Sequence, residues 1–333
     1  MPSLERESQR IVIAGASSLL GAELKSLLEE SKFAGWDLRL VDEEIAAGTL
    51  TEAGGEPAVI QPVEEGSFDR ARLIFFTGSA EFTRANVPAA RKSNATVVDL
   101  SGALASETGT SAWFPVLDVL RSNAFSANAA AYSVPSAAAS AASALSLGLA
   151  PLGLQRLVFI AFQPVSAAGR AGIKELESQT SQLLSLQAVG KAVFDAQVAF
   201  AMLDKFGPAS SQNLLSARER FRDEIEICLA DRVGLPAFQL IHVPLFYGLT
   251  FAACAQIAPE INCPRLMEAI NAAGFALAKD DEGVSNLSAA GESLIQMASP
   301  EADPAGSWWF WGAADNIRLP AWNAVKLAEK LVP

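Results

Sequence analysis

The strongest constraint on the fold is an alternation of short apolar runs with amphipathic segments between residues 10 and 102. RIVIAGA, WDLRLVD, ARLIFFTG and ATVVDLSG are typical of strands. Between them, LLGAELKSLLEE has apolar residues at helical spacing, and AEFTRANVPAARKS is a second helical segment. Strands that alternate with helices imply parallel βαβ units. The sequence therefore predicts an α/β domain over residues 1–130, a Rossmann-type doubly wound parallel sheet of the dinucleotide-binding kind.

The pattern changes after about residue 150. QRLVFIAFQPVS, DEIEICLADRV and FQLIHVPLFYGLTFAACAQI are predicted as long strands, with one clear helical region at about 170–205. Runs of strands after a βαβ half indicate an α+β domain, here over residues 131–312, whose sheet packs against helices or a partner chain. LPAWNAVKLAEKLV predicts an amphipathic helix within residues 313–333 that returns to the first domain.

Composition and charge exclude several classes of function. Half of the residues are hydrophobic, so the chain can bury a large core. The formal net charge of -12 argues against nucleic acid, because phosphate neutralisation needs clustered lysine and arginine. Residues 122–155 carry no charge, but their prolines, asparagines and serines favour a buried, close-packed helix over a membrane span. We expect neither a nucleic-acid nor a membrane partner.

Histidine and cysteine are scarce. The chain has 3 cysteines without CxxC spacing and 1 histidine, His242, so no zinc site is expected. An odd number of cysteines in apolar surroundings fits a reducing cytoplasm. The N-terminal MPSLERESQR lacks the apolar stretch of a signal peptide. We therefore expect a cytoplasmic protein.

A glycine-containing loop follows the first predicted strand. GASSLLG places Gly15 at the end of that strand and Gly21 in the next helix, where backbone N–H groups can bind a pyrophosphate. Ser18 stands where such loops carry a middle glycine, and its Cβ can obstruct a phosphate. Asp42, at the end of the second strand, is positioned to accept hydrogen bonds from an adenosine ribose and favours NAD over NADP. A purely structural loop, with Asp42 as a cap or surface charge, remains an alternative.

Segments along nearly the whole chain resemble the aspartate-semialdehyde dehydrogenase family, which shares its architecture with the N-acetyl-glutamyl-phosphate reductases. GASSLLGAEL resembles the family's GATGxVG loop, and FFTGSAEFT with VVDLSGAL resembles its segment ending in VVDNSSAFR. FDAQVAFAML is similar to FPxQIAFNxxP. AFQPVSAAGRAG is similar to YQAVSGAG, and DNIRLPAWNAVKLAE to DNLRKGAALNAVQIAE. The last two similarities are the most specific.

The resemblance implies a homodimer that interconverts an acyl phosphate and an aldehyde with NADPH. In that chemistry a cysteine thiolate forms the acyl-enzyme, a histidine transfers protons, and an arginine holds the substrate carboxylate. It also implies a set of cofactor-binding positions: Gly15, Ala16, Ser17, Ser18, Gly21, Asp42, Gly78 and Asn323. Polar positions like those of the substrate site, either relics or structural, are Gln163, Arg220, Glu224 and His242.

The residues of the family's chemistry are absent. Its PNC motif falls on VPSAAAS, which places Ala137 at the cysteine position, or Ser136 if the register shifts by one. Its arginine-then-histidine pattern falls on HVPLFYGL, with His242 in place of arginine and Leu249 in place of histidine. The phosphate-handling arginine is also missing, since SGALASETG has no cation.

Two classes of function follow. The joint loss of nucleophile, base and anchor predicts a catalytically inactive dimer that keeps the fold, with binding of NAD, NADP or another small ligand retained or lost. The alternative is an active NAD(P)-dependent oxidoreductase on an aldehyde or acyl phosphate, such as aspartate semialdehyde, using Ser136 or a displaced base at His242. Cys254, with apolar neighbours, is predicted to be a buried, inert thiol. An interaction module without any ligand is the third hypothesis.

Overall fold

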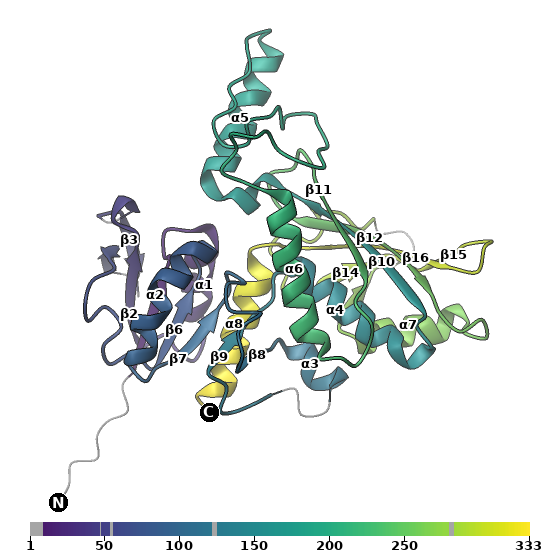
Figure 1. Cartoon of the computed structure of the whole chain (residues 1–333), viewed down its shortest axis with the longest axis horizontal. Coiled ribbons are helices and arrows are strands. Elements are labelled where there is room, and N and C mark those ends of the chain that lie inside the picture. Colours follow the sequence, from purple (N-terminus) through teal and green to yellow (C-terminus); the bar gives the residue numbers. More distant parts are fainter. Residues whose placement is uncertain (1–8, 47, 54–55, 122–124, 280–282) are drawn as a thin grey trace, which may run out of the picture. The chain divides into compact units, whose positions relative to one another are not determined.

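The computed structural model describes residues 9–46, 48–53, 56–121, 125–279 and 283–333 (Figure 1). The chain divides into two compact units. The first comprises Met1–Pro115, Phe125–Val134 and Pro320–Pro333; the second comprises Val116–Ala124 and Pro135–Leu319. Because the placement of one unit against the other is not fixed, each is described by itself.

Among the described residues, the first unit contains a seven-stranded sheet whose paired strands all run parallel. In sheet order the strands are β5 (Gln61–Pro62), β2 (Asp37–Asp42), β1 (Arg10–Ala14), β6 (Leu73–Phe76), β7 (Thr96–Asp99), β9 (Ala131–Ser133) and β8 (Thr110–Ala112). The remaining elements are α1 (Leu19–Glu29), η1 (Glu44–Ala46), the hairpin β3 (Leu50–Ala53)–β4 (Glu56–Val59), α2 (Ala80–Lys92), and residues 320–331 of α8 (Arg318–Leu331). This is the Rossmann-type sheet that the sequence predicts.

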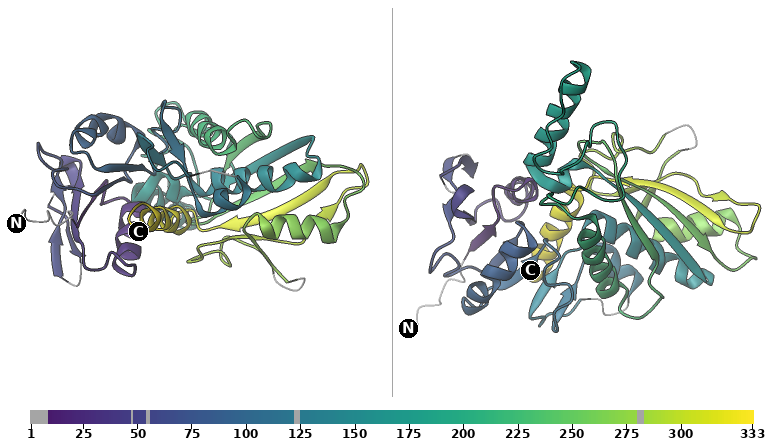
Figure 2. Two further views of the ribbon diagram at one scale, coloured as in Figure 1. Left: turned by 90° about the horizontal axis from the view of Figure 1, so that it is seen from below. Right: turned by 45° about the horizontal axis from the view of Figure 1, so that its top comes forward.

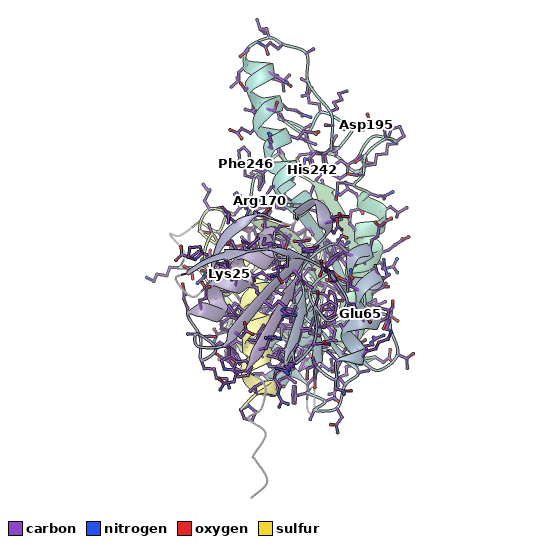
Figure 3. The ribbon with its side chains drawn as sticks, turned by 90° about the vertical axis from the view of Figure 1, so that its left-hand side faces the viewer. Lys25, Glu65, Arg170, Asp195, His242 and Phe246 are labelled. Carbon is purple, nitrogen blue, oxygen red and sulfur yellow. The ribbon has the colours of Figure 1, made fainter. Side chains whose placement is uncertain are left out.

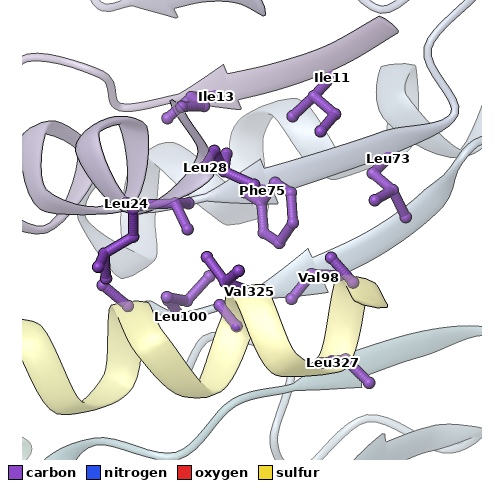
Figure 4. Close-up of a cluster of buried hydrophobic side chains, with 14 of the residues drawn as sticks. Ile11, Ile13, Leu24, Leu28, Leu73, Phe75, Val98, Leu100, Val325 and Leu327 are labelled. Carbon is purple, nitrogen blue, oxygen red and sulfur yellow. The ribbon is translucent and has the colours of Figure 1, made fainter. Parts of the chain in front are cut away.

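Both faces of this sheet are buried, which explains the continuous apolar runs of its strands. Successive side chains of a strand point to opposite faces. On one face, Ile13 packs in a cluster with Leu24 of α1 and Val325 of α8 (Figure 4). On the other face, Val12 belongs to a cluster with Phe82 of α2. Helices that cover both faces leave the carboxyl edge of the parallel strands for the glycine loop.

The second unit is built on a mixed sheet. In sheet order its strands are β11 (Ala237–His242), β10 (Arg156–Gln163), β12 (Leu249–Gln256), β16 (Trp308–Ala314), β14 (Ile295–Met297) and β13 (Phe275–Leu277), with β15 (Glu301–Ala302) paired to β16. Its helices are α4 (Ala137–Leu149), η2 (Ala150–Leu152), η3 (Val165–Ala168), α5 (Gly169–Leu184), α6 (Leu214–Leu229) and α7 (Cys263–Ala272), and α3 (Pro115–Leu120) lies at the junction of the two units in sequence. Together with the first unit, this confirms the predicted fold class.

Helices cover one face of the second sheet. Every residue of α4 is buried, because its alanines and serines let it pack against β10, β12, α6 and α7. Phe159 of β10 points to this face and stacks on Phe251, whereas its neighbours Val158 and Ile160 are partly exposed on the other face. α5 extends away from the sheet of its own unit (Figure 2).

Three predictions about the second unit are wrong in detail. DEIEICLADRV is not a strand but the end of α6 and the turn after it. Its alternation of isoleucine with charged residues suits a strand, yet Phe221, Ile225 and Leu229 also form one buried helical face, and Asn213 caps the helix. Those longer-range features favour the helix.

The predicted helical region at 170–205 is shorter than expected. α5 ends at Leu184. Leu186 has a φ of 56°, in the left-handed region, so a right-handed helix cannot continue through it. The long strand predicted over 238–257 is divided into β11 and β12. Gly248, with a φ of 86°, turns the chain between them. In the part of the chain that the structure describes, no helix is both long and apolar enough to cross a membrane.

Candidate functional site

The position predicted for the family's cysteine lies at the start of α4. Ala137 is the first residue of that helix and is 3 % exposed, so it contributes only a methyl group. Ser136 is the N-cap, and its Oγ accepts a hydrogen bond from the Ala139 N–H at 3.3 Å. The residue before a helix whose free N–H groups need an acceptor is commonly a serine. Ser136 therefore performs a structural task.

Hydrogen bonds to Glu224 fix the position of Ser136. The carboxylate is 1 % exposed on α6, and its Oε2 accepts hydrogen bonds from the Ser136 N–H at 3.0 Å and from the Ser136 Oγ at 2.6 Å. A bond from a hydroxyl to a carboxylate is short and strong because the acceptor carries charge. The Ser136 hydroxyl therefore donates its hydrogen to the Glu224 carboxylate. The acceptor beside Ser136 is thus a carboxylate and not a histidine, the base on which the family's chemistry relies.

Gln163 and His242 lie side by side at the carboxyl ends of β10 and β11, where they are register partners in the parallel pair. The His242 ring is 1 % exposed and packs against Phe206 and Phe194, with ring centroids 5.3 and 5.7 Å away. Figure 3 shows its position in the second unit. Among the described residues, no group donates a hydrogen bond to Gln163 Oε1, and neither ring nitrogen of His242 has a partner within hydrogen-bonding geometry. Two buried polar side chains therefore occupy neighbouring positions at this end of the strands.

Burial sets the charge of His242. It lowers the pKa of the imidazole from 6.5 to about 4, although the backbone of Val198 partly opposes the shift. The ring is therefore neutral at pH 7. A neutral imidazole cannot hold a substrate carboxylate as a bidentate guanidinium does.

Leu249 and Arg220, at two further positions predicted from the family's motifs, both lie beside hydrocarbon or aromatic groups. Leu249 is the first residue of β12 and is 3 % exposed, a hydrocarbon side chain where the family has its base. The Arg220 guanidinium lies over the Phe221 ring, 5.5 Å from its centroid.

Sequence reasoning missed a cavity of about 330 Å³ in this unit, whose lining includes Lys205, Arg218 and Phe206. No motif in the sequence indicated it.

None of the 3 cysteines lies in the VPSAAAS segment to which the family's cysteine motif corresponds. Cys228 is fully buried, and desolvation raises the pKa of its thiol to about 12. Cys254 was predicted to be buried, which is wrong: it is partly exposed on the open face of the sheet, because alternate side chains of β12 point away from the helices. Within the described ranges, no three His, Cys, Asp or Glu side chains are grouped to hold a metal ion.

The glycine loop makes close contacts with Thr77 and Gly78 of the same unit. Gly15 has a φ of 91°, and a Cβ there would lie 2.2 Å from the Gly78 nitrogen, so both glycines allow one close backbone approach. Ser18 caps α1: its Oγ accepts the Gly21 N–H at 2.9 Å and donates to the Thr77 carbonyl at 2.9 Å. The serine in place of the middle glycine therefore takes one of the helix donors that a phosphate would use.

Asp42 is bound to the same loop. Its Oδ2 accepts the Ser17 N–H at 2.7 Å, and its Oδ1 accepts the Glu43 N–H at 2.8 Å. Ala16 is buried, and its N–H donates to the Val41 carbonyl. Asn323 of α8 is 2 % exposed, and its Nδ2 has no partner among the described residues. The structure thus gathers the loop residues, Asp42 and Gly78, while their role in holding a cofactor stays a prediction.

Replacing Ser136 with alanine should destabilise the second unit. The change removes the cap of α4 and one hydrogen bond to a buried carboxylate, so we expect the free energy of unfolding to fall by about 1–3 kcal/mol in urea titrations. Ser136→Thr keeps a hydroxyl and is the control, with a smaller loss. Equal stability of Ser136→Ala and the native protein would show that the Ser136–Glu224 hydrogen bond does not contribute to the free energy of unfolding.

The pKa of His242 predicts a loss of stability in mild acid. The unfolded imidazole binds a proton below about pH 6.5 and the folded one only below about pH 4, so stability falls as the pH decreases through this range. Between pH 7 and pH 5 the expected cost is about 2 kcal/mol. His242→Phe should lose this share of the pH dependence. Because the chain has 1 histidine, its imidazole NMR signal gives the pKa directly; a midpoint near 6.5 would contradict the burial.

Comparisons with known proteins agree with this architecture. Residues 10–144 match the family model "Semialdehyde dehydrogenase, NAD binding domain", and residues 147–319 match "Semialdehyde dehydrogenase, dimerisation domain". A USG-1 protein homolog from Pseudomonas aeruginosa is 28 % identical and covers 97 % of each chain. Aspartate-semialdehyde dehydrogenase 2 from Vibrio cholerae is 23 % identical, again over 97 % of each.

Solved structures show the same fold. A probable aspartate-semialdehyde dehydrogenase from Pseudomonas aeruginosa has a TM-score of 0.84 at 26 % identity and covers 98 % of both chains. The Candida albicans enzyme with NADP has a TM-score of 0.67 at 14 % identity, over 97 % of this chain and 98 % of that one, a likeness of fold alone. From its two domain matches and its architecture, the chain belongs to the semialdehyde dehydrogenase family.

Proposed function

We propose that this chain is a catalytically inactive member of the family that acts as a dimeric protein. The observation that carries the proposal is the start of α4, where Ala137 takes the cysteine position and Ser136, beside it, is bound to Glu224. The acyl-transfer chemistry of the family needs a soft nucleophile with a low pKa. An N-cap hydroxyl that donates its proton to a buried carboxylate does not meet that need.

The base and the substrate anchor support the same proposal. Leu249 cannot transfer a proton, and the chain's 1 histidine, His242, is buried and neutral at pH 7. Loss of a general base alone costs on the order of 10²–10⁴ in rate, and loss of the nucleophile removes the covalent path altogether. An oxidoreductase on this scaffold would need a nucleophile and a base that the described residues do not provide.

The open face of the second sheet supports a homodimer. Val158, Cys254 and Trp309 are register partners in one row across β10, β12 and β16, and Ile160, Ala252 and Trp311 form the next row. Trp309 and Trp311 are 44 % and 40 % exposed. A contiguous apolar patch of this kind is typical of an interface. We assign it to a second copy of the chain because the matching family model is a dimerisation domain.

The absence of turnover is tested with purified protein, aspartate semialdehyde, phosphate and either NAD or NADP. We expect no formation of reduced nicotinamide, because the predicted nucleophile position holds Ala137 and the neighbouring Ser136 hydroxyl is hydrogen-bonded to Glu224. Vibrio cholerae aspartate-semialdehyde dehydrogenase 2, assayed in parallel, is the positive control. Turnover that Ser136→Ala abolishes would overturn the proposal and favour an active oxidoreductase.

The dimer is tested by sedimentation. Ile160→Glu with Trp309→Glu places two charges on the apolar face, so we expect the native protein to sediment as a dimer and this variant as a monomer. Leu50→Glu, at a site 76 % exposed in β3 of the first unit, is the control and should remain dimeric. A monomeric native protein would contradict the assignment of the face.

A further inference from the structure

A cavity of about 620 Å³ in the first unit adjoins the glycine loop. Asp42 contributes to its wall and also accepts the Ser17 N–H of the loop. On another side the wall includes Phe82, the residue that a Cβ on Gly78 would touch at 2.9 Å. The cavity thus lies at the end of β2, where a Rossmann-type sheet receives the adenosine of a dinucleotide.

The lining of this cavity is acidic on several sides. The carboxylates come from the end of β2 and the residues after it, from the segment after β5, and from the first turn of α2: Asp42, Glu43, Glu44, Glu64 and Glu81. The other lining residues are Pro62, Val63, Phe82, Ala85 and Asn86. Among the described residues that line it, no lysine or arginine is present to balance these charges.

NAD and NADP differ only in a 2′-phosphate on the adenosine ribose, and the cavity fits one of them. A ribose donates its hydroxyl hydrogens to carboxylate oxygens, as Asp42 allows. A phosphate monoester carries a charge of about -1.5 to -2 at pH 7 and needs cationic partners. Here it would meet carboxylates from three segments of the chain. The residues present therefore fit the adenosine of NAD and do not fit that of NADP.

We propose that this cavity binds the adenosine half of NAD and excludes that of NADP, and that the four glutamates, not Asp42 alone, set this selectivity. Asp42 already accepts one backbone N–H on each oxygen, so its charge is partly compensated. Glu43, Glu64 and Glu81 are the outlying charges that a 2′-phosphate approaches. The inference concerns binding alone and goes beyond the proposed lack of catalysis, so either can fail without the other.

The first test measures binding to the full-length protein by isothermal titration calorimetry. The ligand pairs are NAD with NADP, and adenosine 5′-monophosphate with adenosine 2′,5′-bisphosphate, which isolates the 2′-phosphate. We expect NAD and the monophosphate to bind at least about a hundredfold more tightly than their 2′-phosphorylated partners, and the gap to narrow in high salt. NADP binding as tight as NAD, or no binding of NAD at millimolar concentration, overturns the proposal.

The second test assigns the selectivity to the glutamates. Glu64→Gln with Glu81→Gln removes two charges from the wall without changing its shape, and should reduce the NAD-to-NADP affinity ratio about tenfold. Glu30→Gln, at the exposed end of α1 and absent from the lining, is the matched control and should leave the ratio unchanged. Circular dichroism verifies that each variant is folded. An unchanged ratio in the double variant would assign selectivity elsewhere and refute the role of the glutamates.

Discussion

The hydrogen bonds from Ser136 to Glu224 join the first turn of α4 to α6, and the helical layer of the second unit depends on that junction. α4 is buried along its whole length and packs against β10 and β12 as well as α6. Its N-terminus has to be satisfied internally, because buried N–H groups without acceptors are costly. Ser136 meets this requirement with the hydroxyl that a serine nucleophile would need. The Ser136 hydroxyl, which a serine nucleophile would need, is therefore engaged in contacts that stabilise the fold.

In both units, residues at predicted ligand positions are engaged in contacts within the chain. Ser18 caps α1 and bonds to Thr77 in the loop of the first unit, and Asp42 accepts from the loop backbone. In the second unit, His242 is enclosed by phenylalanine rings and is neutral. The predicted substrate position therefore carries no charge from His242 at pH 7. The predicted nucleotide position, in contrast, is acidic, because Asp42 is accompanied by four glutamates.

Local patterns predicted much of the fold. The strands β1, β2, β6 and β7 follow from apolar runs because a parallel sheet buries both faces. α6 was misassigned in its second half, since Ile225, Ile227 and Leu229 alternate as in a strand, and only the upstream cap at Asn213 and Phe221 favour a helix. The assignment of Ala137 and Leu249 to the family's cysteine and histidine positions rests on motifs and stays a prediction. The bond between Ser136 and Glu224 joins residues 88 positions apart, and the acidic cavity gathers separate segments, so neither has a local signal.

Covalent chemistry at Ser136 is the point on which an active enzyme and an inactive one differ most directly. The measurement is the intact mass of the protein after incubation with aspartyl phosphate, followed by peptide mapping of residues 131–149. A hydroxyl bound to Glu224 should stay unmodified, so the mass is predicted to remain that of the free chain. An acyl group found on Ser136 would contradict this prediction and establish a serine-based acyl-transfer mechanism.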